Sequence, residues 1–304
     1  MGGCFRSGAR RRTLVAGHRS PGFPLSSDYF SARRPASEQA KMSAGAMSEL
    51  IGITTSGGRR WPAPIDTDRE IRCVPEIREL LVSIYSNYAW VYDLLAEQRH
   101  VGALRGRMPV LTGTIGEVPT VVKRLYHGGS TAWLWRDRFL SSRRVVSFIT
   151  AAEYLRERKV LTPRVLFASW LRRNGFVRAE LGFERLPGRD ADHFFFESPD
   201  PPSNWVVESR KIGEMVASLH RVGFVHGDLN LMNVFLRDDG SVYILDLDKA
   251  RHREHEIDEA TRRKNLSRLE RSIRKQGRNH PTELAESIIR LMNEAYQKKL
   301  KIED

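Results

Sequence analysis

The chain has 304 residues, and a content of 40% hydrophobic and 29% charged residues is typical of a folded globular protein and excludes a collagen-like or wholly disordered chain. No apolar run approaches the ~18 residues of a membrane span, and two cysteines cannot build a disulfide framework, so we expect a reducing compartment and at most peripheral membrane contact. The 50 Lys and Arg residues outnumber the 37 Asp and Glu residues, which gives a net charge of +13 and indicates anionic partners.

Residues 1–46 form a basic segment rich in Gly, Ser, Ala and Arg. Only Asp28 and Glu38 oppose its Lys and Arg residues, so a large share of the excess positive charge lies here. Because the segment has no periodic apolar face, we expect it to be disordered. Its Arg-rich and acid-poor composition is that of a transit peptide; the alternative is that synthesis begins at Met42 or Met47.

The following segment, residues 47–97, is predicted to be an N-terminal extension with one helix over about 75–92. Apolar residues such as Ile77, Leu81 and Ile84 recur there every three or four positions, which is the spacing of an amphipathic helix.

Residues 98–186 are predicted to be rich in strands. Short β-branched or apolar runs punctuated by turn residues indicate strands at 110–117, 118–125, 165–167 and 178–186. The strand over 118–125 carries Lys123, and one long helix is expected over about 143–158.

Residues 187–304 are predicted to be mostly helical. One helix covers about 205–221, with Gly223 as a plausible C-cap, and the last helix begins near Pro281 with acidic residues early and basic residues late. Strands followed by helices around a short hairpin make a two-lobed α+β layout.

The strongest chemical signal lies in residues 224–248. Two apolar runs flank an Asp-Asp-Gly-Ser turn, which predicts a β-hairpin. Asp228 and Asn233 precede its first strand and Asp246 follows its second strand, so the hairpin brings all three side chains to one end.

This arrangement suits phosphoryl transfer. Asp228 is placed to orient an attacking hydroxyl and accept its proton, while Asn233 and Asp246 offer the oxygen ligands that Mg²⁺ prefers. Lys123, on an earlier strand, supplies a cation for the phosphates of ATP.

Two neighbours of these residues have other expected roles. His226 is predicted to pack and hydrogen-bond behind the Asp228 segment, because Asp228 already supplies the carboxylate that accepts the proton. Asp248 either assists metal binding or pairs with Lys249 or Arg251.

These motifs resemble the protein-kinase-like superfamily and, more closely, the lipopolysaccharide kinase family. The runs that carry the closer resemblance are 123–130, 135–139, 225–233, 245–249 and 265–273. The resemblance covers about residues 98–278. It implies a protein-kinase-like fold with a small β-rich N-lobe over 98–186 and a reduced, mostly helical C-lobe over 187–304.

The resemblance also implies further site residues. A Gly-rich loop is expected near 102–108, and a helix carboxylate is expected to pair with Lys123; Glu153 is the first carboxylate of that helix and Glu157 follows one turn later. Candidate substrate contacts are residues whose charge or backbone N–H groups suit an anion, namely His127, Gly128, Gly129, Arg136, Arg138, Arg268 and Arg271.

The implied activity is ATP- and Mg²⁺-dependent phosphorylation of the 3-deoxy-D-manno-octulosonic acid (Kdo) sugar of a lipid A precursor, at the cytoplasmic face of the inner membrane. A peripheral protein of this kind binds the membrane surface through basic residues. We expect no nucleic-acid partner, because no DNA-binding motif accompanies the charge, and no obligate protein partner is indicated. A soluble small-molecule kinase of the aminoglycoside or choline type shares the Asp-Asn-Asp core and is the alternative.

Overall fold

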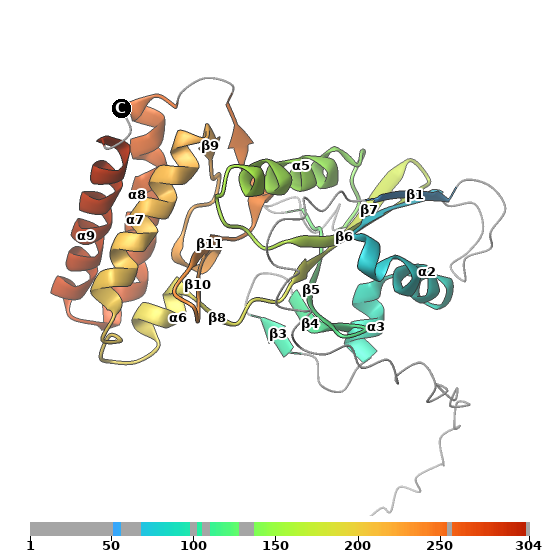
Figure 1. Cartoon of the computed structure of the whole chain (residues 1–304), viewed down its shortest axis with the longest axis horizontal. Coiled ribbons are helices and arrows are strands. Elements are labelled where there is room, and N and C mark those ends of the chain that lie inside the picture. Colours follow the sequence, from blue (N-terminus) through green and yellow to red (C-terminus); the bar gives the residue numbers. More distant parts are fainter. Residues whose placement is uncertain are drawn as a thin grey trace, which may run out of the picture. The chain divides into compact units, whose positions relative to one another are not determined.

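The computed structural model describes residues 51–55, 68–97, 102–104, 110–127, 137–253 and 257–301, all within one compact unit, Met47–Asp304 (Figure 1). The predictions for residues 1–46, for most of the Gly-rich loop, and for Gly128, Gly129 and Arg136 lie outside these residues. The described part is a mixed α and β structure.

Within the described residues, seven antiparallel strands form the main sheet. In spatial order they are β1 (Ile51–Thr55), β2 (Asp68–Cys73), β6 (Val165–Arg173), β7 (Phe176–Glu184), β5 (Val118–Arg124), β4 (Val110–Ile115) and β3 (Gly102–Leu104). The predicted hairpin over 110–125 is confirmed. The extension over 47–97 adds β1 and β2 to the sheet, beyond the single helix predicted for it.

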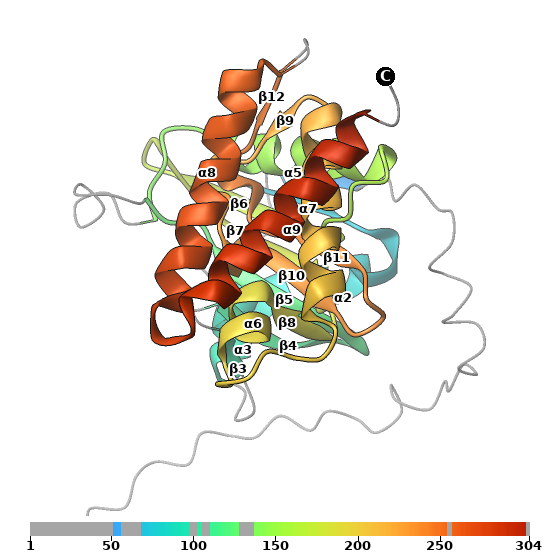
Figure 2. The same cartoon turned by 90° about the vertical axis from the view of Figure 1, so that its left-hand side faces the viewer.

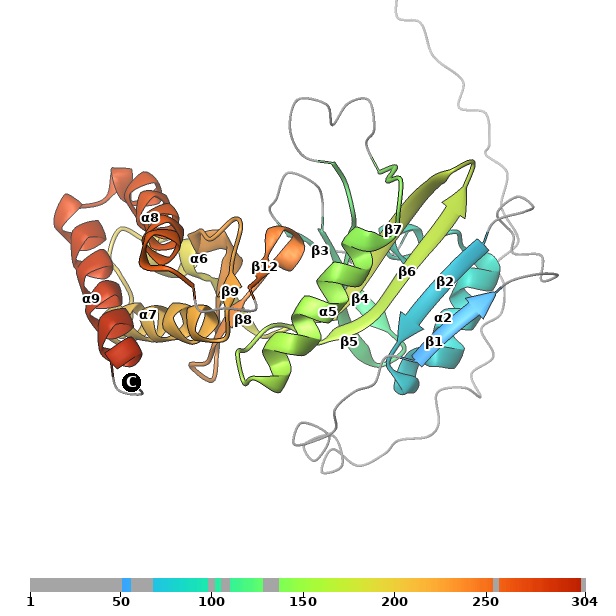
Figure 3. The ribbon, with the colours of Figure 1, turned by 90° about the horizontal axis from the view of Figure 1, so that it is seen from above.

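Helices cover both faces of this sheet (Figure 3). Helix α5 (Arg143–Glu157) packs its buried residues Phe148 and Ile149 into one hydrophobic cluster, whereas α2 (Arg78–Asn87) and α3 (Val91–Glu97) pack into a second cluster. The sheet is therefore buried between two helical layers, which fixes the position of β5 and of Lys123 on it.

The predicted helix over 75–92 is interrupted. Residues Pro75–Ile77 form a 3₁₀ turn, and Tyr88 has extended backbone between α2 and α3. The buried carboxylate of Glu180 on β7 accepts the backbone N–H groups of Val91 and Tyr92 at 2.9 and 3.0 Å, so it satisfies the first turn of α3. Burial raises the pKa of this carboxyl group. The interruption of the predicted helix therefore depends on Glu180, which is 89 positions from Val91 in the chain.

Three long helices, α7 (Trp205–Arg221), α8 (Glu259–Gln276) and α9 (Thr282–Lys301), lie side by side (Figure 2). Gly213 permits close packing of α7 on α9, because a Cβ atom there would lie 2.1 Å from the carbonyl oxygen of Met292. The buried His220 of α7 connects all three helices: its ring hydrogen-bonds Tyr296 of α9 at 2.8 Å and Asn265 of α8 at 3.0 Å. The predictions for α7 and α9 are confirmed.

Short strands connect the sheet to these helices. They are β8 (Gly188–Asp190), β9 (Phe224–Val225), β10 (Val234–Arg237), β11 (Val242–Ile244) and β12 (Arg251–His252), and α6 (Ala191–Phe196) follows β8. The predicted hairpin is β10–β11, in which Val234 faces Ile244 and Leu236 faces Val242. This register places the two ends of the hairpin side by side.

Candidate active site

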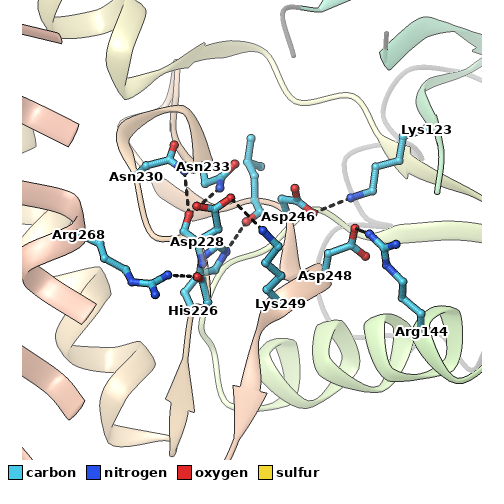
Figure 4. Close-up of polar contacts among 12 residues, drawn as sticks. Lys123, Arg144, His226, Asp228, Asn230, Asn233, Asp246, Asp248, Lys249 and Arg268 are labelled. Atoms are coloured by element: carbon cyan, nitrogen blue, oxygen red, sulfur yellow. Dashed lines mark hydrogen bonds and ion pairs between the residues drawn. The ribbon is translucent and has the colours of Figure 1, made fainter. Parts of the chain in front are cut away.

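The loop between β9 and β10, residues 226–233, presents Asp228 and is called the Asp228 loop here (Figure 4). Asn230 accepts the backbone N–H of Met232 at 3.0 Å and starts a 3₁₀ turn, Leu231–Asn233. The side-chain amides of Asn230 and Asn233 each donate to the carbonyl oxygen of Asp228 at 2.8 Å. The loop backbone is therefore fixed, while the Asp228 carboxylate remains 57% exposed.

Asp246 lies at the same end of the hairpin as Asn233, because the backbone N–H of Leu245 donates to the carbonyl oxygen of Asn233 at 2.8 Å. Its backbone is in the left-handed region, with φ of 53°. Its carboxylate accepts a hydrogen bond from Lys123 Nζ at 2.8 Å. Burial tends to raise the pKa of Asp246, whereas the charge and hydrogen bond of Lys123 and the backbone N–H of Asp248 together lower it. The net pKa lies below the usual value for an Asp.

Lys123 lies on the predicted strand, but its ion-pair partner differs from the one expected. Its ammonium group pairs with Asp246 and lies 4.8 Å from the centre of the Phe148 ring. Glu153 is exposed on α5, where the charges acting on it are those of Arg72 and Glu157. The expected ion pair between Lys123 and Glu153 is therefore not formed in this structure. The cause is the rotation of α5 about its axis, which buries Phe148 and turns Glu153 to solvent.

His226 supports the Asp228 loop from behind. It is fully buried, and one ring nitrogen, Nε2, lies 2.8 Å from the carbonyl oxygen of Leu245. The other, Nδ1, accepts the backbone N–H of Asp228 at 3.2 Å. Burial lowers the pKa of His226, so the ring is neutral and donates from Nε2. It thus ties the Asp228 loop to the strand that leads to Asp246, as predicted.

The opposite side of the Asp228 loop contacts α8 and the segment after Asp246. Arg268 donates to the carbonyl oxygen of Gly227. A Cβ atom on Gly227 would lie 2.2 Å from the carbonyl oxygen of Lys249, so only glycine fits there without a shift. The ammonium group of Lys249 lies 3.9 Å from the Asp228 carboxylate. Arg268, which was expected to contact the substrate, therefore lies next to the site and binds the backbone of the Asp228 loop.

Within the described residues, Asp248 pairs with neither Lys249 nor Arg251, the two ion-pair partners expected for it. Its carboxylate accepts a hydrogen bond at 2.6 Å from Arg144, a residue of the first turn of α5 that the sequence reading did not single out. Arg144 also donates to the carbonyl oxygen of Tyr126 at 2.8 Å and stacks over the Phe139 ring. One guanidinium group thus joins the segment after β5, helix α5 and the segment after Asp246. No local pattern signals this pair, since its members lie far apart in the chain.

The oxygen atoms near Asp246 suit a magnesium ion. The Asn233 amide nitrogen donates to Asp228, which leaves its oxygen as a ligand, and the Asp246 carboxylate is 45% exposed. Mg²⁺ commonly takes only one or two protein oxygens and completes its coordination with phosphates and water. Asp248 Oδ1 is buried without a hydrogen-bond partner two residues further on. Within the described residues, no cluster of three or more His, Cys, Asp or Glu side chains forms a metal cage.

The remaining predicted contacts are only partly described. The His127 ring stacks on Phe139 with centres 4.4 Å apart and hydrogen-bonds the carbonyl oxygen of Arg138 at 2.7 Å. The side chains of Arg138 and Arg271 are exposed. Asp228, Asn233, Asp246 and Lys123 come together. Arg138 and Arg271 make no hydrogen bond or ion pair with these four residues in the part of the chain that the structure describes.

Several known proteins are similar in sequence to this chain. A 3-deoxy-D-manno-octulosonic acid kinase of Vibrio parahaemolyticus is 35% identical over 118 residues, which are 38% of this chain and 47% of that protein. Proteins of the same name from Xanthomonas euvesicatoria and Vibrio vulnificus are 31% and 26% identical over 185 residues. These matches cover 59% and 60% of this chain and 71% and 76% of the relatives. A sequence model of the lipopolysaccharide kinase (Kdo/WaaP) family matches residues 94–290 and includes every residue of the site above. The chain therefore belongs to the lipopolysaccharide kinase (Kdo/WaaP) family.

Proposed function

We propose that this protein transfers the γ-phosphoryl group of ATP to a hydroxyl of the Kdo sugar of a Kdo-lipid A precursor, in lipopolysaccharide synthesis. The relatives from Vibrio and Xanthomonas are named Kdo kinases. The observation that carries the proposal is the convergence of Asp228, Asn233, Asp246 and Lys123 at one end of the β10–β11 hairpin. These residue types, in the chain order Lys, Asp, Asn and Asp, are those that kinases use for phosphoryl transfer.

Asp228 is the proposed catalytic base. Its backbone is held by Asn230, Asn233 and His226, while its carboxylate is exposed to an incoming hydroxyl. A fixed backbone keeps the carboxylate oriented toward the attacking oxygen, and the carboxylate accepts the proton that the hydroxyl loses.

Asn233 and Asp246 are the proposed ligands of Mg²⁺, which neutralises charge on the phosphate oxygens when bound. Lys123, on β5, is the proposed cation for the ATP phosphates. It now pairs with Asp246, so this ammonium group is already located beside the proposed metal ligands. A sheet that carries Lys123 and a helical part that carries Asp228 support the two-lobed protein-kinase-like architecture, with a β-rich N-lobe and a mostly helical C-lobe.

We further infer that the protein works as a peripheral protein on the cytoplasmic side of the inner membrane. The acceptor is a lipid, and the exposed arginines at positions such as 138 and 271 have the sign that an anionic surface attracts. Among the described helices, none combines the length and apolarity that a membrane crossing requires.

The test is a panel of acceptors incubated with the purified full chain and Mg-ATP. It contains a Kdo-bearing lipid A precursor, the same lipid without Kdo, an aminoglycoside, choline and a protein substrate. We expect phosphate incorporation only where Kdo is present. Turnover of the aminoglycoside or choline, with none of the Kdo-bearing lipid, would establish the small-molecule kinase alternative.

A further inference from the structure

A cavity of about 550 Å³ lies beside the Asp228 loop. His226 and Gly227 form one wall, the segment from Asp248 to Arg253 forms another, and α8 forms the third. Thr261, Lys264, Asn265 and Arg268 line it at the spacing of one helix face. The cavity therefore begins at the residue next to Asp228 and extends along α8.

The lining of this cavity is strongly basic. Its basic side chains are Lys249, Arg251, Arg253, Lys264 and Arg268. Among the lining residues that the structure describes, Asp248 is the only acidic one, and its carboxylate is already paired with Arg144. A cavity with this excess of positive charge attracts an anion.

Two of the basic side chains in the lining have no ion-pair partner within the described structure. Lys249 lies near Asp228, Arg253 lies 3.6 Å from Asp258, and Arg268 binds the Gly227 carbonyl. Arg251 and Lys264, by contrast, are exposed and have no ion-pair partner among the residues that the structure describes. They are the side chains of the lining whose charge remains for a ligand.

The cavity walls are held in place by backbone contacts. Arg251 pairs with Val225 in the β9–β12 ladder, and the N–H of Arg253 donates to the carbonyl oxygen of Gly223 at 2.8 Å. The Asn265 amide donates to the carbonyl oxygen of His226 at 2.6 Å, which fixes α8 against the loop. A ligand therefore meets a pocket that is already formed, and binding costs less ordering.

The cavity and the nucleotide-binding residues lie on different sides of Asp228. Figure 4 shows Arg268 on one side of Asp228 and Lys123 on the other, with Lys249 below the carboxylate. In phosphoryl transfer the attacking and leaving oxygens are roughly in line across the phosphorus atom. If the ATP phosphates lie at Lys123 and Asp246, the acceptor approaches Asp228 from the side of this cavity.

We propose that the cavity binds the carboxylate of the acceptor sugar acid, with Lys264 and Arg251 as its main contacts. This inference rests on the proposed function, which supplies an acceptor that carries a hydroxyl group and a carboxylate in one small sugar. With the hydroxyl at Asp228, the carboxylate of the same sugar reaches the basic cavity that begins at Gly227. Arginine and lysine bind a carboxylate through charge-assisted hydrogen bonds.

The test compares Lys264→Gln and Arg251→Gln with the wild type, and uses Lys298→Gln as the matched control. Lys298 is also an exposed helical lysine, but it lies near the end of α9 and outside the cavity lining. KM is measured for ATP and for three acceptors: a Kdo-bearing lipid A precursor, its Kdo methyl ester, and the Kdo-bearing lipid with its phosphates removed. Melting curves of all variants verify folding.

We expect Lys264→Gln and Arg251→Gln each to raise the KM for the unmodified acceptor about tenfold, because a charge-assisted hydrogen bond is lost. The KM for ATP should change by less than about twofold, and Lys298→Gln should match the wild type. On the methyl ester, wild type and variants should have the same KM. The difference should persist on the lipid without phosphates.

Two results would overturn the inference. One is an acceptor KM for both variants equal to that of Lys298→Gln. The other is a difference that survives on the methyl ester and vanishes without the lipid phosphates, since the bound anion would then be a phosphate.

Failure of the proposed function is recognised separately. If the wild type phosphorylates no Kdo-bearing acceptor, the proposed function is wrong, and binding of the free sugar acid by ligand-observed NMR still tests the cavity. Binding that is lost in Lys264→Gln supports the cavity as a sugar-acid site. Equal binding in wild type and variant, or none in either, contradicts it.

Discussion

Two side-chain amides, from Asn230 and Asn233, hold the carbonyl oxygen of Asp228, and His226 accepts its N–H group. Asp246, on the adjacent strand end, holds a left-handed backbone that is costly for residues other than glycine. Asp and Asn tolerate this conformation better than most residues do. The site thus combines a fixed backbone with exposed carboxylates, which suits a transient ligand.

Replacement of Asp246 tests its role as a metal ligand. Asp246→Asn keeps the size of the side chain and its tolerance of positive φ, but removes the charge. We expect Mg-ATP to bind at least about tenfold more weakly, because a carboxylate ligand of Mg²⁺ is lost. Metal-free ATP should bind equally or more tightly, since Lys123 loses its internal partner. Isothermal titration calorimetry with and without Mg²⁺ measures both affinities; an unchanged affinity for Mg-ATP would remove the metal role.

The pair formed by Arg144 and Asp248 is the second prediction at this scale. The two side chains are 29% and 15% exposed, so each charge is largely desolvated. Arg144→Met alone should destabilise the protein by about 2–4 kcal/mol, because the carboxylate of Asp248 is left without its cation. In a double-mutant cycle with Asp248→Asn, urea unfolding should give a coupling energy of about 1–3 kcal/mol. Strict additivity of the two substitutions would show that the contact contributes nothing.

At the scale of elements, the α7–α8–α9 bundle contains a buried His220 that is neutral in the folded state. Burial lowers the pKa of His220 from 6.5 to about 4. Between these values the unfolded chain binds a proton that the folded protein does not, so stability falls as the pH drops from about 6.5 toward about 4. The full effect is about 3 kcal/mol, and it is absent above the unfolded pKa.

The measurement is urea unfolding of the wild type and His220→Gln at pH 7.5 and pH 4.5. The variant should be less stable at pH 7.5, because it lacks the ring that hydrogen-bonds both Tyr296 and Asn265. Its loss of stability between the two pH values should be smaller than that of the wild type by roughly 2–3 kcal/mol. An equal loss in both proteins would place the acid sensitivity elsewhere.

Some contacts between secondary-structure elements can be predicted from the sequence. The β10–β11 hairpin, and with it the convergence of Asp228, Asn233 and Asp246, follows from the turn residues and the two apolar runs that flank them. The position of Lys123 follows from its strand. Such features depend only on residues close together in the sequence and on the register in which β10 pairs with β11.

Other contacts depend on how distant elements pack, and the sequence alone did not predict them. Glu180 of β7 breaks the predicted helix over 75–92 by binding the start of α3. Arg144 and Asp248 meet only because α5 packs on the segment after β11. The sequence does not determine how α5 is rotated about its axis, so Glu153 was expected to face Lys123. In the structure, Phe148 of α5 lies beside Lys123 instead. Helix periodicity defines a face but not its neighbour.

At the scale of the whole molecule, the net charge of +13 is divided between the N-terminal segment and the folded part. Arg268 and Arg271 were predicted to bind substrate, and the structure separates their environments. Arg268 contacts the Asp228 loop, whereas the Arg271 side chain is exposed and Glu270 pairs with Arg274 instead. Their substitution should therefore have different effects.

Arg271→Gln should raise the KM for a lipid acceptor and weaken liposome binding, because each basic residue near an anionic surface contributes about 1 kcal/mol. Added salt should reduce the difference from the wild type by screening. Arg268→Gln should instead lower kcat by loosening the Gly227 backbone. Co-sedimentation with anionic liposomes over a salt series, beside steady-state kinetics, measures both effects, and Arg290→Gln on α9 is the control. Binding by Arg271→Gln that equals the control at low salt would contradict the surface role.

The most direct test of the account is the turnover of Asp228→Asn with Mg-ATP and a Kdo-bearing lipid A precursor. This substitution keeps the shape of the side chain and the backbone hydrogen bonds, and it removes the proposed base. We predict that the wild type phosphorylates the Kdo sugar, and that kcat falls by on the order of 10²-fold or more in the variant while Mg-ATP still binds. If Asp228→Asn phosphorylates the Kdo sugar with the kcat of the wild type at saturating substrates, the assignment of Asp228 as the catalytic base is contradicted.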